Sequence, residues 1–70
     1  MVLSKAKTHI SYSIQAIETT DEGMKDFLFS LGCHEGQTIT IISNLGSNMV
    51  VNINDARYSI DLELAKAIIV

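Results

Sequence analysis

Cysteine is nearly absent from this chain, which has a single one, Cys33, among 70 residues. A lone cysteine cannot form an internal disulfide, whereas short secreted domains usually have several cysteines. Residues 1–7 also lack the apolar core and the small-residue cleavage site of a secretory signal. We therefore expect a cytoplasmic protein.

Long hydrophobic runs are missing too. The longest, at residues 39–42 and 67–70, are far shorter than the ~20 residues that a membrane-spanning helix needs. Direct membrane insertion is therefore not expected. The length and the globular composition, 47% hydrophobic and 19% charged, predict one folded domain over residues 1–70.

Basic residues are few, and the formal net charge is −3. The five basic residues are scattered rather than clustered: Lys5, Lys7, Lys25, Arg57 and Lys66. A nucleic-acid-binding protein normally needs a basic patch, because neutralising phosphates supplies much of its affinity. The chain also has neither of the glycine-rich motifs that hold nucleotide phosphates. We expect no nucleic-acid partner and no enzymatic activity.

The regular features that are present are short alternating apolar segments, typical of half-buried strands. They predict strands over residues 12–17, 37–44, 49–54, 57–60 and 67–70. Asn54 and Asp55 tolerate positive φ and predict a tight hairpin between the third and fourth of these strands. Asp61 is expected to cap a single helical turn over residues 62–65.

One longer helix is predicted between the first two strands. Thr19 and Glu22 fit the capping-box pattern, with Thr19 as the N-cap. Gly32 is suited to the left-handed conformation that follows a helix, so the helix should end at about Leu31. Its apolar stripe, at the spacing of one helical face, consists of Met24, Phe27, Leu28 and Leu31.

The order of these elements predicts a mainly β fold: a small five-stranded SH3-like barrel with one α-helix and one short helical turn. Closing the sheet removes exposed strand edges, and the longer helix would cover one open end. The residues expected to be buried together are Leu31, Ile39, Ile41, Val51, Ile53, Ile60 and Ile68.

Three segments of the chain resemble the FeoA family, small cytosolic partners of the FeoB ferrous-iron transporter. Residues 28–36 (LFSLGCHEG) are similar to its L-L-x-L-G-apolar-x-x-G stretch. Residues 44–49 (NLGSNM) resemble its A-P-L-G-D-P-I loop, and residues 60–70 (IDLELAKAIIV) resemble its L-R-x-x-E-A-x-x-I-x-V ending. The resemblance implies a protein that docks on the cytosolic part of a FeoB-like membrane GTPase and modulates Fe(II) uptake.

Departures from that pattern fall at positions where the family often has a basic residue or a proline. They include Phe27, Glu35, Asp61 and the surroundings of Gly46. These changes leave the prediction of a barrel intact, but they alter the chemistry of the surface that would face a partner.

Cys33, His34 and Glu35 are all types of metal ligand. Three consecutive residues do not easily point at one ion, and no second cluster has zinc- or iron-like spacing. We therefore expect no metal site and no cofactor, with ferrous iron bound weakly at most, Cys33 buried and His34 in a solvated loop. The alternative hypothesis, a small metal-binding or metal-sensing SH3-like module, remains open here.

Candidate partner-binding residues are those apolar side chains that the core pattern does not account for. Phe29 lies about 140° from Met24 on a helical wheel, outside the predicted stripe. It is either a second core contact, which we favour, or an exposed side chain. Leu45 and Gly46 lie at the tip of a predicted turn, where apolar residues often mark contact surfaces. The predicted partner-binding residues are Phe29, Leu45 and Gly46.

Overall fold

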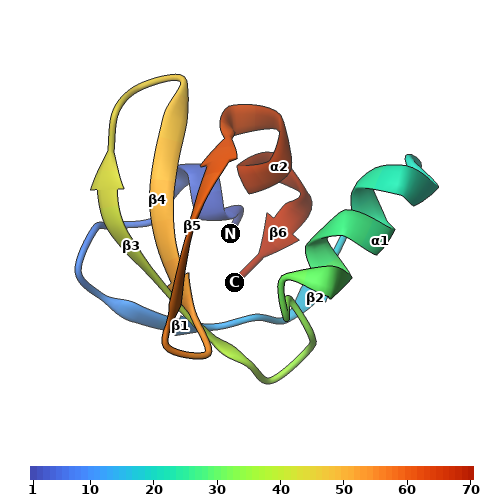
Figure 1. The fold of residues 1–70 in the computed structure, drawn as a ribbon, viewed down its shortest axis with the longest axis horizontal. Helices are drawn as coiled ribbons and strands as arrows, with labels where there is room; N and C mark the ends of the chain where they lie inside the picture. The colour runs from blue at the N-terminus through green and yellow to red at the C-terminus, as the bar shows by residue number, and fades with distance from the viewer.

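The computed structural model describes all of residues 1–70, and its strands and helices follow the expected order (Figure 1). The elements are η1 (Leu3–Lys5), β1 (Ser11–Ser13), β2 (Ala16–Ile17), α1 (Glu22–Ser30), β3 (Thr38–Asn44), β4 (Asn48–Ile53), β5 (Ala56–Asp61), α2 (Leu62–Ala67) and β6 (Ile68–Ile69). The mainly β fold predicted from the sequence, with one longer and one shorter helix, is confirmed.

The strands form two antiparallel sheets rather than one closed barrel. Four strands lie in the order β1-β3-β4-β5, and β2 pairs with β6. The single strand predicted over residues 12–17 is divided between the sheets. The Ile14 amide donates to the Gln37 carbonyl, beside β3, and the next amide, of Gln15, donates to the Ile69 carbonyl in β6. The chain thus changes sheets at Ile14, whose side chain is buried.

The hairpin between β4 and β5 has the predicted two-residue turn. Asn54 and Asp55 adopt φ values of 52° and 63°, as a type I′ turn requires, and this turn matches the twist of the strands that it joins. The hairpin is regular along its length, from Ile53 opposite Ala56 to Asn48 opposite Asp61. The only register shift in the larger sheet lies in the pairing of β3 with β4.

The N-cap of α1 is Asp21, so the prediction of Thr19 was wrong. Asp21 Oδ1 accepts a hydrogen bond from the Met24 amide at 3.1 Å, while Thr19 Oγ1 accepts one from the Asp21 amide at 3.1 Å. A carboxylate at the cap also interacts favourably with the positive end of the helix dipole. The predicted end is confirmed: Gly32 has φ 97°, and the Cys33 amide donates to the Leu28 carbonyl, closing a Schellman motif.

Thirteen hydrophobic side chains form the core. Six of the residues predicted to be buried together are in it, namely Ile39, Ile41, Val51, Ile53, Ile60 and Ile68. Leu31 is only half-buried and packs at the edge of this core, and Leu28 is the fully buried side chain of α1. Helix α1 therefore packs on the core mainly through Leu28.

The N-terminal segment is part of the fold, although the sequence predicted no element there. Val2 forms a β-bridge with Ile69, and the Val70 amide donates to the Met1 carbonyl at 2.8 Å. Leu3, in η1, is completely buried. No helix in the structure has both the length and the apolar character needed to cross a membrane.

Candidate partner-docking surfaces

Helix α1 exposes two aromatic rings to solvent. The exposed fraction is 47% for Phe27 and 38% for Phe29, whereas Leu28 between them is buried. Successive helical residues point about 100° apart, so a helix that is seated through Leu28 turns its two neighbours to either side. The prediction that Phe27 belongs to the buried stripe was wrong for this reason. The two rings are therefore exposed on different sides of α1, about 200° apart around its axis.

Phe29 is exposed rather than the second core contact that we favoured from the sequence. Its ring stacks on the His34 imidazole, with ring centroids 5.3 Å apart and an interplanar angle of 25°. The Lys25 ammonium lies 5.8 Å from the centroid of the same ring, within the range of a cation–π interaction. The exposed Phe29 ring is thus bordered by an ammonium group and an imidazole, a combination suited to an apolar partner surface with acidic residues at its rim.

Leu45 and Gly46 form the tip of the turn between β3 and β4. Leu45 is 72% exposed, the most exposed large hydrophobic residue of the chain. The turn is held by two hydrogen bonds, from the Leu45 amide to the Asn48 carbonyl at 2.8 Å and from the Gly46 amide to Asn44 Oδ1 at 3.0 Å. Gly46 has φ 91°, which favours glycine at this position. The turn therefore presents the Leu45 side chain to solvent from an ordered backbone.

The structure does not bring these two candidate sites together. Figure 1 shows α1 on one side of the molecule and the turn between β3 and β4 on the other. A partner that contacts both Phe29 and Leu45 must therefore reach around the domain. Otherwise each residue belongs to a different contact.

The three adjacent residues of metal-ligand type do not converge. Cys33 is completely buried in the core, while His34 and Glu35 are exposed. The chain nowhere groups three or more His, Cys, Asp or Glu side chains so that they could hold a metal ion. Burial raises the pKa of the Cys33 thiol from 9.0 to about 11. The thiol is thus a small hydrophobic core group, as the sequence predicted.

This pKa shift predicts a loss of stability at high pH. The thiol ionises near pH 9.0 when unfolded and near 11 when folded, so its contribution to stability is complete below pH 9 and is lost as the pH rises toward 11. Between these pH values, urea denaturation should show a steeper fall in the free energy of unfolding for the wild type than for Cys33→Ala. Parallel pH profiles would contradict the assignment, since other groups titrate equally in both proteins.

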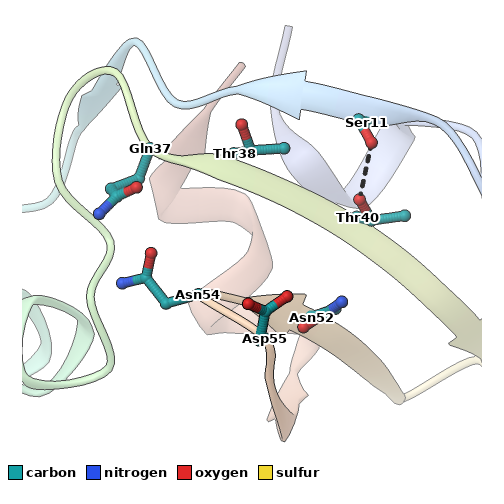
Figure 2. A pocket seen from close by; sticks show the side chains of 7 residues that line it. All are labelled: Ser11, Gln37, Thr38, Thr40, Asn52, Asn54 and Asp55. Carbon is teal, nitrogen blue, oxygen red and sulfur yellow. Dashed lines mark hydrogen bonds between the residues drawn. The ribbon is translucent and has the colours of Figure 1, made fainter.

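A polar hollow of about 320 Å³ lies on the outer side of the larger sheet, as Figure 2 shows. It is lined by Ser11, Gln37, Thr38, Thr40, Asn52, Asn54 and Asp55, with no hydrophobic residue. Ser11 and Thr40 share a hydrogen bond at 3.2 Å, and Asn52 Oδ1 is buried with no hydrogen-bond partner. Most small-molecule sites have apolar walls. With one carboxylate and no histidine or cysteine, the hollow also lacks an acid–base pair.

Sequence reasoning did not identify this hollow. Thr38 and Thr40 alternate with buried isoleucines, so the sequence does indicate that they face outward. What it does not provide is the register that places Ser11 opposite Thr40 and Thr40 opposite Asn52.

Comparison with solved structures defines the class of this fold. The chain is similar to a Stenotrophomonas maltophilia FeoA complexed with zinc, described as an SH3 domain protein and a proposed ferrous iron transport activating factor (TM-score 0.88, 19% identity, 99% of this chain and 87% of the other). It is also similar to FeoA from Chlorobium tepidum (TM-score 0.87, 21% identity, 99% and 67%) and to a manganese-dependent transcriptional repressor (TM-score 0.88, 17% identity, 97% and 39%). These likenesses establish an SH3-like domain.

The family follows from the sequence itself. The FeoA domain model matches residues 1–70, and the chain belongs to the FeoA domain family. No curated protein matches the sequence.

Proposed function

We propose that this protein is a cytoplasmic accessory protein that docks on the cytosolic part of a FeoB-type ferrous-iron transporter and modulates Fe(II) uptake. Membership of the FeoA domain family supports this role. The observation that carries the proposal is the Phe29 ring on α1, which is 38% exposed and has the Lys25 ammonium and the His34 imidazole beside it.

In this proposal the protein acts by binding and performs no chemistry of its own. The only cysteine is a buried thiol with a raised pKa, and thiolate is the form that reacts as a nucleophile. His34 stacks on Phe29 and is adjacent in sequence to a thiol that points into the core. Nucleotide hydrolysis would belong to the transporter.

Docking is expected to depend on Phe29 and on the turn that contains Leu45 and Gly46. Burying a fully exposed side chain of this size contributes about 1.5–3 kcal/mol. Because Leu45 is 72% and Phe29 38% exposed, Leu45→Ala should weaken binding by about tenfold and Phe29→Ala by about threefold. The measurement is isothermal titration calorimetry of each variant against the purified cytosolic domain of a FeoB-type transporter. Circular dichroism would first confirm that each variant is folded.

Ile10 provides a matched control, because it is a large hydrophobic residue with 45% exposure outside both candidate sites. Ile10→Ala should bind as the wild type does. If only Phe29→Ala weakens binding, the contact is confined to α1, and if only Leu45→Ala does, it is confined to the turn. Folded Phe29→Ala and Leu45→Ala variants that both bind at wild-type strength would refute this assignment of the docking residues.

We further propose that docking needs no metal bound to this chain. One neighbouring FeoA structure is a zinc complex, which keeps a small metal-binding module as the second candidate. Here the potential ligands are separated, since Cys33 points into the core while His34 packs on Phe29. Repeating the calorimetry with a chelator should leave the affinity unchanged. An affinity that falls with chelator and returns with zinc or ferrous iron would favour the second candidate.

A further inference from the structure

Strand β5 is an open edge of the larger sheet. It pairs with β4 on one side and with no strand on the other. None of the backbone hydrogen bonds outside the helices and ladders involves Ala56–Asp61. The Asp61 carbonyl, at the N-cap of α2, accepts the first hydrogen bond of that helix. The other outward amides and carbonyls of β5 are not paired with any strand, which is the condition for pairing with another strand.

The hairpin geometry identifies the outward groups. In a two-residue turn the closing residues, Ile53 and Ala56, form a hydrogen-bonded pair, and hydrogen-bonded and non-hydrogen-bonded pairs alternate from there. Tyr58 and Ile60 thus bond to β4. The backbone groups of Arg57, Ser59 and Asp61 point away from it, and their side chains are exposed.

This edge has few of the features that usually prevent association. Natural edge strands are often very short, interrupted by proline or a bulge, or carry inward-pointing charges. β5 has six residues and an unbroken register with β4, and the chain contains no proline. Its only charged side chains are Arg57 and Asp61, of opposite sign and at equal distances in sequence from Ser59.

We propose that β5 pairs with β5 of a second copy of this chain, antiparallel and about a two-fold axis at Ser59. In this register each Arg57 lies directly opposite the partner's Asp61, on the same face of the sheet. The two-fold axis therefore gives the dimer two pairs of opposite charge, each between Arg57 of one copy and Asp61 of the other. The two Ser59 residues exchange amide-to-carbonyl hydrogen bonds. Each Asp61 amide donates to the carbonyl of the partner's Arg57. The result is one continuous sheet across the dimer.

Charge selects this register over its neighbour. Moving the axis by one residue, to Tyr58, would place each Asp61 opposite the partner's Asp55, and like charges facing each other across strands are destabilising. Asp61 also caps α2, with its Oδ1 accepting from the Leu64 amide at 2.9 Å. Its second carboxylate oxygen is free to accept from the partner's Arg57.

Ser59→Pro tests the proposal directly. Proline removes the outward Ser59 amide, which has no bond within the chain, and is tolerated at an edge strand whose amide faces solvent. Sedimentation equilibrium should show a reversible wild-type dimer with a dissociation constant on the order of 10⁻⁴ M, given so small an interface. Ser59→Pro should self-associate at least about tenfold more weakly than the wild type. Ser59→Ala keeps the amide and should self-associate as strongly as the wild type.

Two further measurements identify the surface and the charges. Raising the protein concentration should slow hydrogen exchange at the Ser59 and Asp61 amides and leave Tyr58 and Ile60 unchanged, because the latter already bond to β4. Arg57→Glu should also weaken the dimer, since it places two carboxylates opposite each other. A chain that stays monomeric up to about 1 mM, or a dimer that Ser59→Pro leaves intact in a folded variant, would overturn the proposal.

Discussion

Replacing Leu28 by alanine is expected to leave much of the protein unfolded at room temperature. Leu28 is the only completely buried side chain of α1, and a buried leucine cut back to alanine typically costs about 2–5 kcal/mol. A domain of this size without a disulfide has only about 3–5 kcal/mol of stability in total. Urea denaturation followed by circular dichroism would measure the loss.

Phe27 is the matched control, because it is adjacent to Leu28 in the same helix and has a larger side chain that is 47% exposed. Phe27→Ala should cost far less than Leu28→Ala, close to the ~0.5 kcal/mol of an ordinary surface change. Leu31→Ala should fall between the two, since Leu31 is half-buried at the edge of the core. A larger loss for Phe27→Ala than for Leu28→Ala would show that α1 is seated on a different face.

The three strands of the central hairpins could be predicted from the sequence because each carries its own signal. Along β3 and β4, buried residues such as Ile39, Ile41 and Val51 alternate with outward ones, and this period of two directly indicates a half-buried strand. The turn between β4 and β5 is equally local, since Asn54 and Asp55 tolerate the positive φ that they adopt. No distant contact was needed for either inference.

The elements that were predicted incorrectly depend on contacts between distant parts of the chain. Residues 12–17 have one alternating pattern, yet they are shared by two strands because β3 and β6 offer pairing edges on different sheets. The sequence alone does not show where the chain leaves one edge for the other. The N-cap of α1 was predicted incorrectly for a similar reason. Thr19 and Asp21 are both good capping residues, and which of them caps the helix depends on the residue at which the helix begins.

The candidate docking surfaces were predicted in part. Leu45 and Gly46 lie at a turn whose composition is visible in the sequence, and their exposure is a consequence of that turn. Phe27 and Phe29 depend instead on the rotation of α1 about its axis, which is set by how Leu28 fits the core. Rotating α1 by a single residue would bury one of these rings in place of Leu28, so a helical wheel alone does not determine which rings are exposed.

The glycines in the segment that resembles the FeoA family have a structural reason to be there. Gly32 and Gly36 adopt φ values of 97° and 89°, which side chains with a Cβ rarely adopt. An added Cβ at Gly32 would also lie 2.8 Å from Asn54 Nδ2. This part of the resemblance therefore reflects how the chain leaves α1 and enters β3, and it supports a prediction of fold more strongly than one of partner chemistry.

Leu3→Ala is expected to destabilise the protein about as strongly as Leu28→Ala, although nothing in the sequence marks Leu3 as a core residue. It lies in a three-residue helix and is completely buried, and residues beside it bond to the last strand, through the bridge between Val2 and Ile69. Removing its side chain leaves a cavity, with an expected loss of about 2–5 kcal/mol in urea denaturation.

Two variants determine whether that loss comes from packing. Leu3→Met keeps nearly the same volume and should cost less than about 1.5 kcal/mol. Lys5→Ala changes an exposed residue of the same helix and should have almost no effect, because surface substitutions usually stay within about 0.5 kcal/mol. If Leu3→Ala unfolds at the same urea concentration as Lys5→Ala, the N-terminal segment contributes no core packing in solution. If Leu3→Met instead keeps most of the stability that Leu3→Ala loses, the Leu3 side chain packs in the core in solution. Residues 1–5 are then as much a part of the core as the strands, which the alternating sequence pattern does predict.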